Sequence, residues 1–235
     1  MKQIIALGGG GFSMEPENLA LDRYILNQAK TPSPSICFIP TASGDSQNYI
    51  DRFYKSYQQL DCKPSHLSLF NPPTRDLEDF LLSKDILFVG GGNTKNLLAL
   101  WKEWHLDIYI KKAWEQGVIL SGLSAGSICW FEQGVTDSFG DGLEPIEALG
   151  FLPGSHCPHY DGEINRRPAF QKFIQEKTLK NGIAADDGVA IHYIDQAIHT
   201  IVSSRKEARA YTVTFTDYLD ESVLIPTYLD QTISQ

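Results

Sequence analysis

Short apolar runs alternate with amphipathic stretches along most of the chain. The apolar runs are typical of buried strands and comprise Ile4–Leu7, Ser35–Pro40, His66–Phe70, Asp85–Val89 and Gly117–Ser121. Between them, apolar side chains recur every three to four positions, as they do in helices. The helices expected on this basis are Asn18–Lys30, Tyr49–Leu60, Leu77–Leu82, Lys95–Trp104 and Leu106–Gln116. Because alternating strands and helices form βαβ units, the pattern predicts an α/β fold with a mostly parallel sheet flanked by helices.

The pattern changes after about Gly182. Four runs separated by polar turns are expected to be strands, namely Val189–Tyr193, Ile198–Ser203, Ala210–Phe215 and Val223–Tyr228. With no convincing helix among them, we interpret them as a C-terminal antiparallel extension. The chain has no linker, repeat or low-complexity segment, so we expect one domain over residues 1–235.

Composition narrows the class of partner. The 29 acidic residues outnumber 20 Lys and Arg, for a net charge of −9, which argues against nucleic acid or an anionic membrane. No apolar run approaches the ~20 residues of a membrane span, and the start of the chain lacks the pattern of a signal peptide. The four cysteines form no CxxC pair. We therefore expect a cytoplasmic protein.

Glycine and small polar residues gather where the expected strands end: Gly8–Gly11, Thr41–Gly44, Gly90–Thr94 and Gly122–Ser127. Parallel sheets bind their ligands beyond the carboxyl ends of their strands. These segments are therefore the first candidates for a functional site.

Gly122–Gly126 fits the pattern G-x-S-x-G, with an apolar strand before it and an expected helix from Ala125 to Phe131 after it. In a nucleophile elbow, a sharp strand-to-helix turn exposes the serine, and its neighbours must be small. The pattern therefore makes Ser124 a candidate nucleophile. A glycine-rich turn that only packs closely is the alternative.

A serine nucleophile needs a base and a group that orients the base. His156 and His159 lie downstream in a segment expected to be a strand. Their side chains should point to opposite faces, so one of the two can meet Ser124. Asp137 and Asp141 are candidate orienting acids, although both also suit turns, Asp141 more so.

The triple glycine of Gly90–Thr94 offers unobstructed backbone N–H groups for an oxyanion hole. A phosphate-binding loop is the competing interpretation. Neither this segment nor Gly8–Gly11 shows G-x-G-x-x-G in a dinucleotide-binding context or G-x-x-x-x-G-K-[ST].

Three motifs together, Val89–Thr94, Gly122–Ser127 and Pro158–Tyr160, resemble the peptidase E family of serine peptidases, which includes dipeptidase E and the cyanophycinases. The resemblance spans roughly residues 1–200. It implies a glutamine-amidotransferase-like fold that needs no metal or organic cofactor.

The resemblance also implies roles for single residues. Ser124 would be the nucleophile and His159 the base, because an aromatic residue follows the family's histidine. Asp137 fits the third position best, with Asp141 in reserve. The backbone N–H groups of Gly92 and Ala125 would form the oxyanion hole.

Characterised members favour an aspartyl residue on the acyl side of the scissile bond. Arg166 and Arg167 follow the histidine motif and, with Asn93, are the expected substrate-binding residues; two solvated arginines at a helix start are the alternative. The turn Asp186–Gly188 stands where relatives carry an acidic residue and a glycine. Its acid would bind a substrate ammonium group or only form the turn.

The resulting hypothesis is a serine peptidase that hydrolyses small peptides through a Ser-His-Asp triad and an acyl-enzyme. A non-peptidase esterase or amidase, and a relative that binds ligand without turnover, are the alternatives. The expected partner is a small peptide substrate, with a homodimer left open for the assembly.

Overall fold

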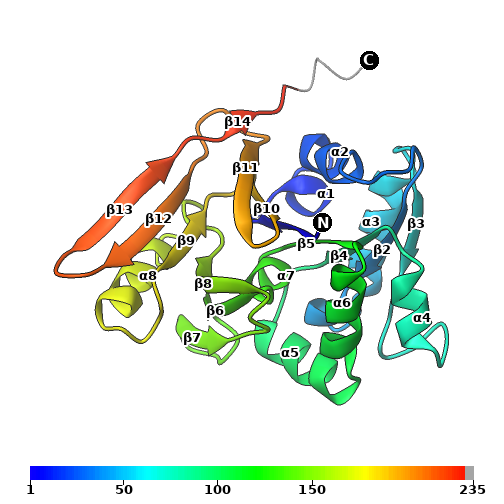
Figure 1. The fold of residues 1–235 in the computed structure, drawn as a ribbon, viewed down its shortest axis with the longest axis horizontal. Coiled ribbons are helices and arrows are strands. Elements are labelled where there is room, and N and C mark those ends of the chain that lie inside the picture. The colour runs from blue at the N-terminus through cyan, green and yellow to red at the C-terminus, as the bar shows by residue number, and fades with distance from the viewer. Residues whose placement is uncertain (231–235) are drawn as a thin grey trace.

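The computed structural model describes residues 1–230 and builds them around two β-sheets (Figure 1). The main sheet has the strand order β14-β11-β10-β1-β5-β4-β2-β3. Its strands are β1 (Gln3–Leu7), β2 (Ser35–Ile39), β3 (Lys63–His66), β4 (Ile86–Val89), β5 (Ile119–Leu123), β10 (Val189–Ile194), β11 (Ala197–Ser203) and β14 (Thr227–Tyr228). The five strands from β1 to β3 in this order are parallel, and β10 joins β1 antiparallel.

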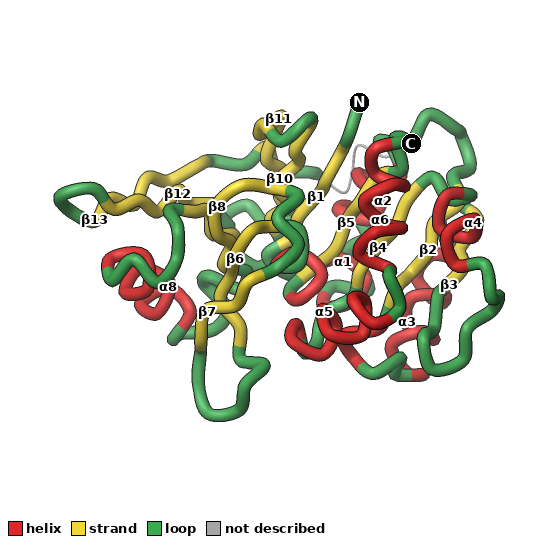
Figure 2. The backbone as a smooth tube through the Cα atoms, turned by 60° about the horizontal axis from the view of Figure 1, so that its bottom comes forward, coloured by secondary structure: helices red, strands yellow, loops and turns green. Residues whose placement is uncertain are grey.

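The second sheet has the order β13-β12-β9-β8-β6-β7. Its strands are β6 (Phe131–Thr136), β7 (Glu144–Glu147), β8 (Leu152–Cys157), β9 (Gly182–Ala185), β12 (Ala210–Phe215) and β13 (Leu219–Leu224). Helix α8 (Arg166–Gln175) covers one side of this sheet (Figure 2).

The remaining helices cover both faces of the main sheet. One face packs against α1 (Gly11–Met14), α2 (Ala20–Leu26) and α3 (Gln47–Tyr57), and the other against α4 (Leu77–Leu82), α5 (Thr94–Glu103), α6 (Leu106–Glu115) and α7 (Ala125–Ile128). Both faces are covered because both are apolar. In β1, Ile4 and Ala6 belong to the core on one face, while Ile5 and Leu7 belong to the core on the other. A strand buried on both faces reads as a continuous apolar run. A short 3₁₀ helix, Thr41–Ser43, follows β2.

This architecture confirms the predicted fold class and differs in single strands. The strand expected at His66–Phe70 lies earlier, as β3 (Lys63–His66). The expected C-terminal strands are antiparallel to their sequence neighbours but divide between the sheets, β10 and β11 in one and β12 and β13 in the other. The last expected strand, Val223–Tyr228, is interrupted around Pro226, which has no N–H to donate to a sheet. No helix among residues 1–230 is long and apolar enough to cross a bilayer.

Asp22 is fully buried beside the start of α1. Its Oδ1 accepts a hydrogen bond of 2.9 Å from the Tyr57 hydroxyl, while Oδ2 has no hydrogen-bond partner in the described part of the chain. Burial raises the pKa of this carboxyl from 3.8 to about 6, against the opposing effect of the Tyr57 hydroxyl.

The raised pKa of Asp22 predicts a pH-dependent stability. Between pH 4 and pH 6 the native state binds the proton more tightly than the unfolded state, so stability falls as pH rises. The pKa difference corresponds to ~3 kcal/mol. Asp22→Asn cannot titrate, so its free energy of unfolding relative to the wild type should improve by about that amount between pH 4 and pH 7. Urea unfolding at both pH values measures this; an unchanged difference would contradict the prediction.

Candidate active site

Ser124 forms the turn between β5 and α7. Its backbone has φ 55° and ψ −119°, a conformation that costs a non-glycine residue ~1–3 kcal/mol and persists only where the surroundings impose it. Within residues 118–131 every residue is buried except Ser124, which is partly exposed. The strained turn therefore presents one side chain, a hydroxyl, at the edge of the main sheet.

Two glycines make this turn possible. A Cβ atom at Gly122 would lie 2.3 Å from the carbonyl oxygen of Gly126, and one at Gly126 would lie 2.2 Å from that of Val89. Both distances are well inside van der Waals contact, so only glycine fits either position. The glycines therefore allow close packing of the turn, as the alternative interpretation expected, and the same turn also exposes the Ser124 hydroxyl.

His159 is held at the neighbouring strand end. It follows β8, and its N–H donates to the Gly8 carbonyl over 3.1 Å. Leu7 pairs with Leu123, so the next residue along β1, Gly8, lies beside Ser124 one strand spacing away. Within residues 1–230 no hydrogen bond joins the Ser124 hydroxyl to the His159 ring.

The carboxylate of Asp187 contacts this ring. Its Oδ1 lies 2.6 Å from Nδ1 of His159, and the two side chains are only 9% and 12% exposed. The backbone N–H of Asp187 donates to Asp161 over 2.8 Å. A carboxylate at Nδ1 favours the tautomer that is protonated at Nδ1, and this tautomer leaves Nε2 able to accept a proton.

Gly9 and Gly162 provide the space for this carboxylate. A Cβ atom at Gly9 would lie 2.1 Å from Oδ1 of Asp187 and 3.0 Å from Cε1 of His159, and one at Gly162 would lie 2.3 Å from Oδ2. Part of the glycine-rich segment after β1 therefore makes room for the Asp187–His159 pair.

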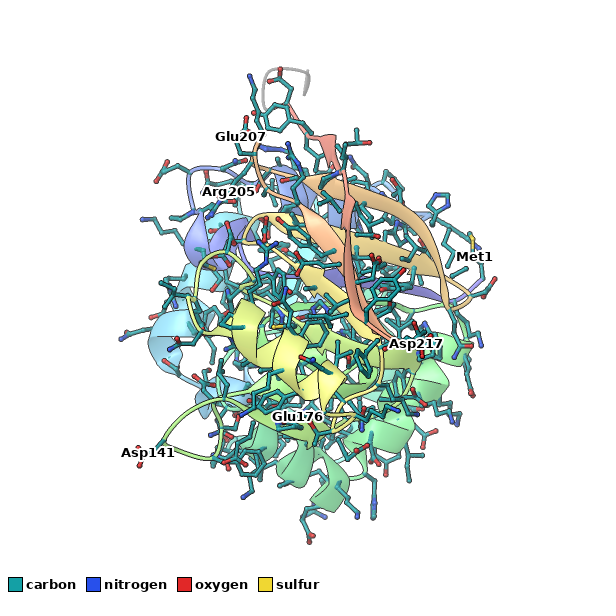
Figure 3. The ribbon with its side chains drawn as sticks, turned by 90° about the vertical axis from the view of Figure 1, so that its left-hand side faces the viewer. Met1, Asp141, Glu176, Arg205, Glu207 and Asp217 are labelled. Carbon is teal, nitrogen blue, oxygen red and sulfur yellow. The ribbon has the colours of Figure 1, made fainter. Side chains whose placement is uncertain are left out.

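The structure assigns the position beside His159 to Asp187 in place of the expected Asp137. Asp137 and Asp141 both lie on the exposed loop after β6, and Asp141 points away from the body of the molecule (Figure 3). Ser138 ties this loop to α5, since its Oγ accepts from the Thr94 N–H over 2.8 Å. The sequence connects the turn Asp186–Gly188 only with a substrate ammonium group or with the turn itself, and no spacing rule relates it to His159.

His156 occupies a different environment, as expected for one of two histidines on opposite faces. It is fully buried and stacked on Phe131, with ring centroids 4.6 Å apart, and its Nδ1 lies 3.0 Å from the Ile183 carbonyl. Burial lowers its pKa to about 3, so the ring is neutral at physiological pH. Its place is in the core of the second sheet.

Asp186 turns away from His159. Its Oδ2 accepts from the Arg209 N–H over 2.8 Å, and Oδ1 is buried without a hydrogen-bond partner among the residues described. Burial raises its pKa to about 6. The two adjacent acids of the turn therefore have separate surroundings.

The triple-glycine loop lies against the serine turn. A Cβ atom at Gly91 would be 3.1 Å from Cβ of Ser124. In residues 1–230 the N–H of Gly92 has no hydrogen-bond acceptor, and the N–H of Ala125, in the first turn of α7, has none within the helix. Both expected oxyanion donors are therefore available near Ser124.

The side chain of Asn93 forms hydrogen bonds within the protein. Its Oδ1 accepts from the Asn96 N–H over 2.8 Å and so caps α5, while Nδ2 donates to the Ser138 carbonyl over 3.1 Å. These bonds join the glycine loop to the loop after β6 and occupy the amide that was expected to bind substrate.

The two expected arginines differ in access. Arg166 is 3% exposed and bonds Glu163 and the Val135 carbonyl, so it has a structural role in place of substrate contact. Arg167 is 49% exposed, and its guanidinium is paired with Glu221.

Arg52, which the sequence analysis did not single out, lies on α3. Its guanidinium stacks 4.9 Å above the ring of Tyr49 and donates to the Ser13 carbonyl. In the described part of the chain no carboxylate pairs with it.

A cavity of about 400 Å³ adjoins the glycine loop through Ala42, whose carbonyl contacts Gly92. It is lined mainly by apolar groups of Thr41, Ala42, Gly44, Phe70, Asn96, Ala99 and Leu100. A larger cavity, about 770 Å³, lies at the amino ends of the strands, beside Pro34 and far from Ser124. Among residues 1–230 no three or more His, Cys, Asp or Glu side chains are grouped to hold a metal ion.

Comparisons with known proteins identify the family of this chain. The model of peptidase family S51 matches residues 4–201. The chain is 59% identical over 226 residues to "Uncharacterized peptidase YgaJ" of Bacillus subtilis (strain 168), covering 96% of this chain and 98% of that protein.

Two crystal structures share the fold. A peptidase from an acI-B1 Actinobacterium superimposes with a TM-score of 0.68 at 17% identity, covering 96% of this chain and 95% of the other. The "Putative Peptidase E Protein" of Listeria monocytogenes EGD-e superimposes with a TM-score of 0.56 at 18% identity, covering 95% and 99%.

Proposed function

Because the chain belongs to peptidase family S51, we propose that it is a serine peptidase that hydrolyses small peptides through Ser124, His159 and Asp187. The observation that carries the proposal is the pairing of His159 with Asp187 at the strand end next to the strained Ser124 turn. A base with a fixed orientation beside an exposed hydroxyl is the arrangement that activates a serine.

In the proposed reaction, the Ser124 oxygen attacks the scissile carbonyl carbon while Nε2 of His159 accepts the serine proton. The tetrahedral intermediate then expels the leaving amine, which takes that proton from His159. Asp187 keeps Nδ1 protonated and stabilises the imidazolium as it forms. Water, deprotonated by the same imidazole, then attacks the acyl-enzyme carbonyl. The bond to the Ser124 oxygen breaks, that oxygen takes the proton back from His159, and the acid is released.

The oxyanion of the intermediate would be stabilised by the N–H groups of Gly92 and Ala125. Both are free of acceptors in the described structure. Ala125 follows Ser124 directly, and Gly92 follows Gly91, which lies against Ser124. Each such donor is worth about 3 kcal/mol in acyl transfer, because it is already aligned when charge develops. The positive end of α7 adds little, since that helix is a single turn.

We further propose that the acyl side carries an aspartyl residue. Arg167 remains the predicted partner of its carboxylate, and Arg52 is a second guanidinium, one that faces no carboxylate among residues 1–230. The apolar cavity beside Gly92 suits an aliphatic side chain elsewhere in the peptide.

A panel of Asp-Leu, Glu-Leu and Ala-Leu dipeptides and a p-nitrophenyl ester tests this function. We expect Asp-Leu to have the highest kcat/KM, about 10-fold or more above Ala-Leu, because a charge-assisted hydrogen bond contributes about 1.5–3 kcal/mol. Hydrolysis of the ester alone would support an esterase instead. Binding of Asp-Leu without turnover would instead support a family member that binds its ligand but has no catalytic activity.

A further inference from the structure

Tyr49 lies between the two segments that flank Ser124. On one side its hydroxyl accepts a hydrogen bond of 3.3 Å from the Gly91 N–H, in the loop after β4. On the other side its ring packs against Phe12 of α1, the helix that follows the Gly8–Gly11 segment. Strand β5, which carries Ser124, runs between β4 and β1. Tyr49 therefore holds the loop beside the expected oxyanion hole through its hydroxyl, and it contacts the helix after the segment that supports His159 through its ring.

The core fixes the position of this phenol. Tyr49 is 6% exposed, and its ring lies 5.0 Å from that of Phe38 and 5.7 Å from that of Phe12. A Cβ atom at Gly90 would lie 3.0 Å from both Phe38 and Tyr49, so the glycine loop rests directly on these rings. The rigid aromatic cluster thus sets the place of the hydroxyl, and the hydroxyl in turn sets the place of the loop.

The loop is held at two points with a free donor between them. Tyr49 holds the N–H of Gly91, and the Ala42 carbonyl accepts from the Asn93 N–H over 2.8 Å. Gly92, between them, has φ 137°, and a Cβ atom there would lie 2.2 Å from the Ala42 oxygen. The backbone of Gly92 is therefore constrained on both sides while its own N–H has no acceptor in residues 1–230.

We propose that Tyr49 is a positioning residue that aligns the Gly91–Gly92 peptide so that the Gly92 N–H faces the developing oxyanion. This inference rests on the proposed function of Ser124. It assigns to the hydroxyl of Tyr49 an effect on the transition state, because a misaligned donor weakens oxyanion stabilisation more than it weakens substrate binding.

Tyr49→Phe tests the inference with a fluorophosphonate probe, which reacts with an activated serine. The variant should react with the probe at least 10-fold more slowly than the wild type, and kcat for Asp-Leu should fall by a similar factor while KM changes less than about 2-fold. Affinity for an aspartyl peptide aldehyde, which forms a tetrahedral adduct with serine, should fall in parallel.

The same helix provides matched controls. Tyr54→Phe removes a hydroxyl bonded to His66, and Tyr57→Phe removes one bonded to Asp22. Both should lose stability without a comparable loss of labelling rate. The labelling rate of each variant is divided by its folded fraction, measured by urea unfolding, so the comparison holds even if Tyr49→Phe folds poorly.

Labelling of folded Tyr49→Phe within 2-fold of the wild type would overturn the inference and leave the proposed function intact. Equal slowing in all three tyrosine variants would also overturn it, since the effect would then reflect general loosening. Failure of the wild type to be labelled at Ser124 would instead refute the proposed function on which the inference rests.

Discussion

Replacement of Ser124 by Gly should abolish hydrolysis and yet leave the protein at least as stable as the wild type. Loss of the nucleophile should lower kcat by about 10⁶-fold, to the level that binding and the oxyanion hole alone support. The backbone at φ 55° and ψ −119° is strained for serine and open to glycine. Relief of ~1–3 kcal/mol of strain would offset the ~1 kcal/mol that glycine costs in conformational entropy.

Urea unfolding and dipeptide hydrolysis measure the two effects of Ser124→Gly on one sample. Ser121→Ala is the control on the same strand, because the Ser121 Oγ is buried and bonds the Ile5 carbonyl over 3.0 Å. That variant should keep its labelling by fluorophosphonate and lose about 1 kcal/mol of stability. Turnover in Ser124→Gly within 10-fold of the wild type would exclude Ser124 as the nucleophile.

Asp187→Asn should lower kcat by about 10⁴-fold, whereas Asp137→Asn should change it less than 2-fold. Asparagine at 187 preserves the shape of the side chain between Gly9 and Gly162. Its amide can donate to Nδ1 of His159, which favours the tautomer with the proton on Nε2, and that nitrogen then cannot accept the proton of serine. Asp137 lies on an exposed loop and makes no contact with the ring.

Steady-state kinetics with Asp-Leu would measure both aspartate variants. Because both changes are isosteric and remove one negative charge, a difference between them reports position and not charge. A loss confined to Asp137→Asn would restore the assignment made from the sequence and would leave Asp187 as a structural partner of His159.

Local patterns were enough to place the serine turn. Apolar runs fall on both faces of β1, β4 and β5, and the small residues at 122 and 126 are demanded by contacts with immediate neighbours and the end of β4. Such requirements can be recognised in a short stretch of the sequence. The strands β6, β7 and β9 were missed, and only the end of β8 was expected, because these strands are short and their burial is interrupted by half-exposed positions.

The proposed orienting acid, Asp187, could not be identified from a local sequence pattern. Asp187 and His159 are 28 positions apart, and they meet because β9 and β8 are neighbours in one sheet while Gly8 and Gly9 receive both residues at the end of β1. Asp137 looked equivalent, since a carboxylate in a turn has the same composition wherever the turn points.

The chain by itself determined the α/β class, the serine turn and the pair of candidate histidines, because strand burial and tight turns act between residues close in sequence. The tertiary structure alone decided which acid contacts His159 and that the Tyr49 hydroxyl contacts the glycine loop. It also decided that the side chains of Arg166 and Asn93 form hydrogen bonds with the backbone. Those outcomes depend on the order of strands and on which side of each loop a polar group finds space, and both arise only when distant segments pack together.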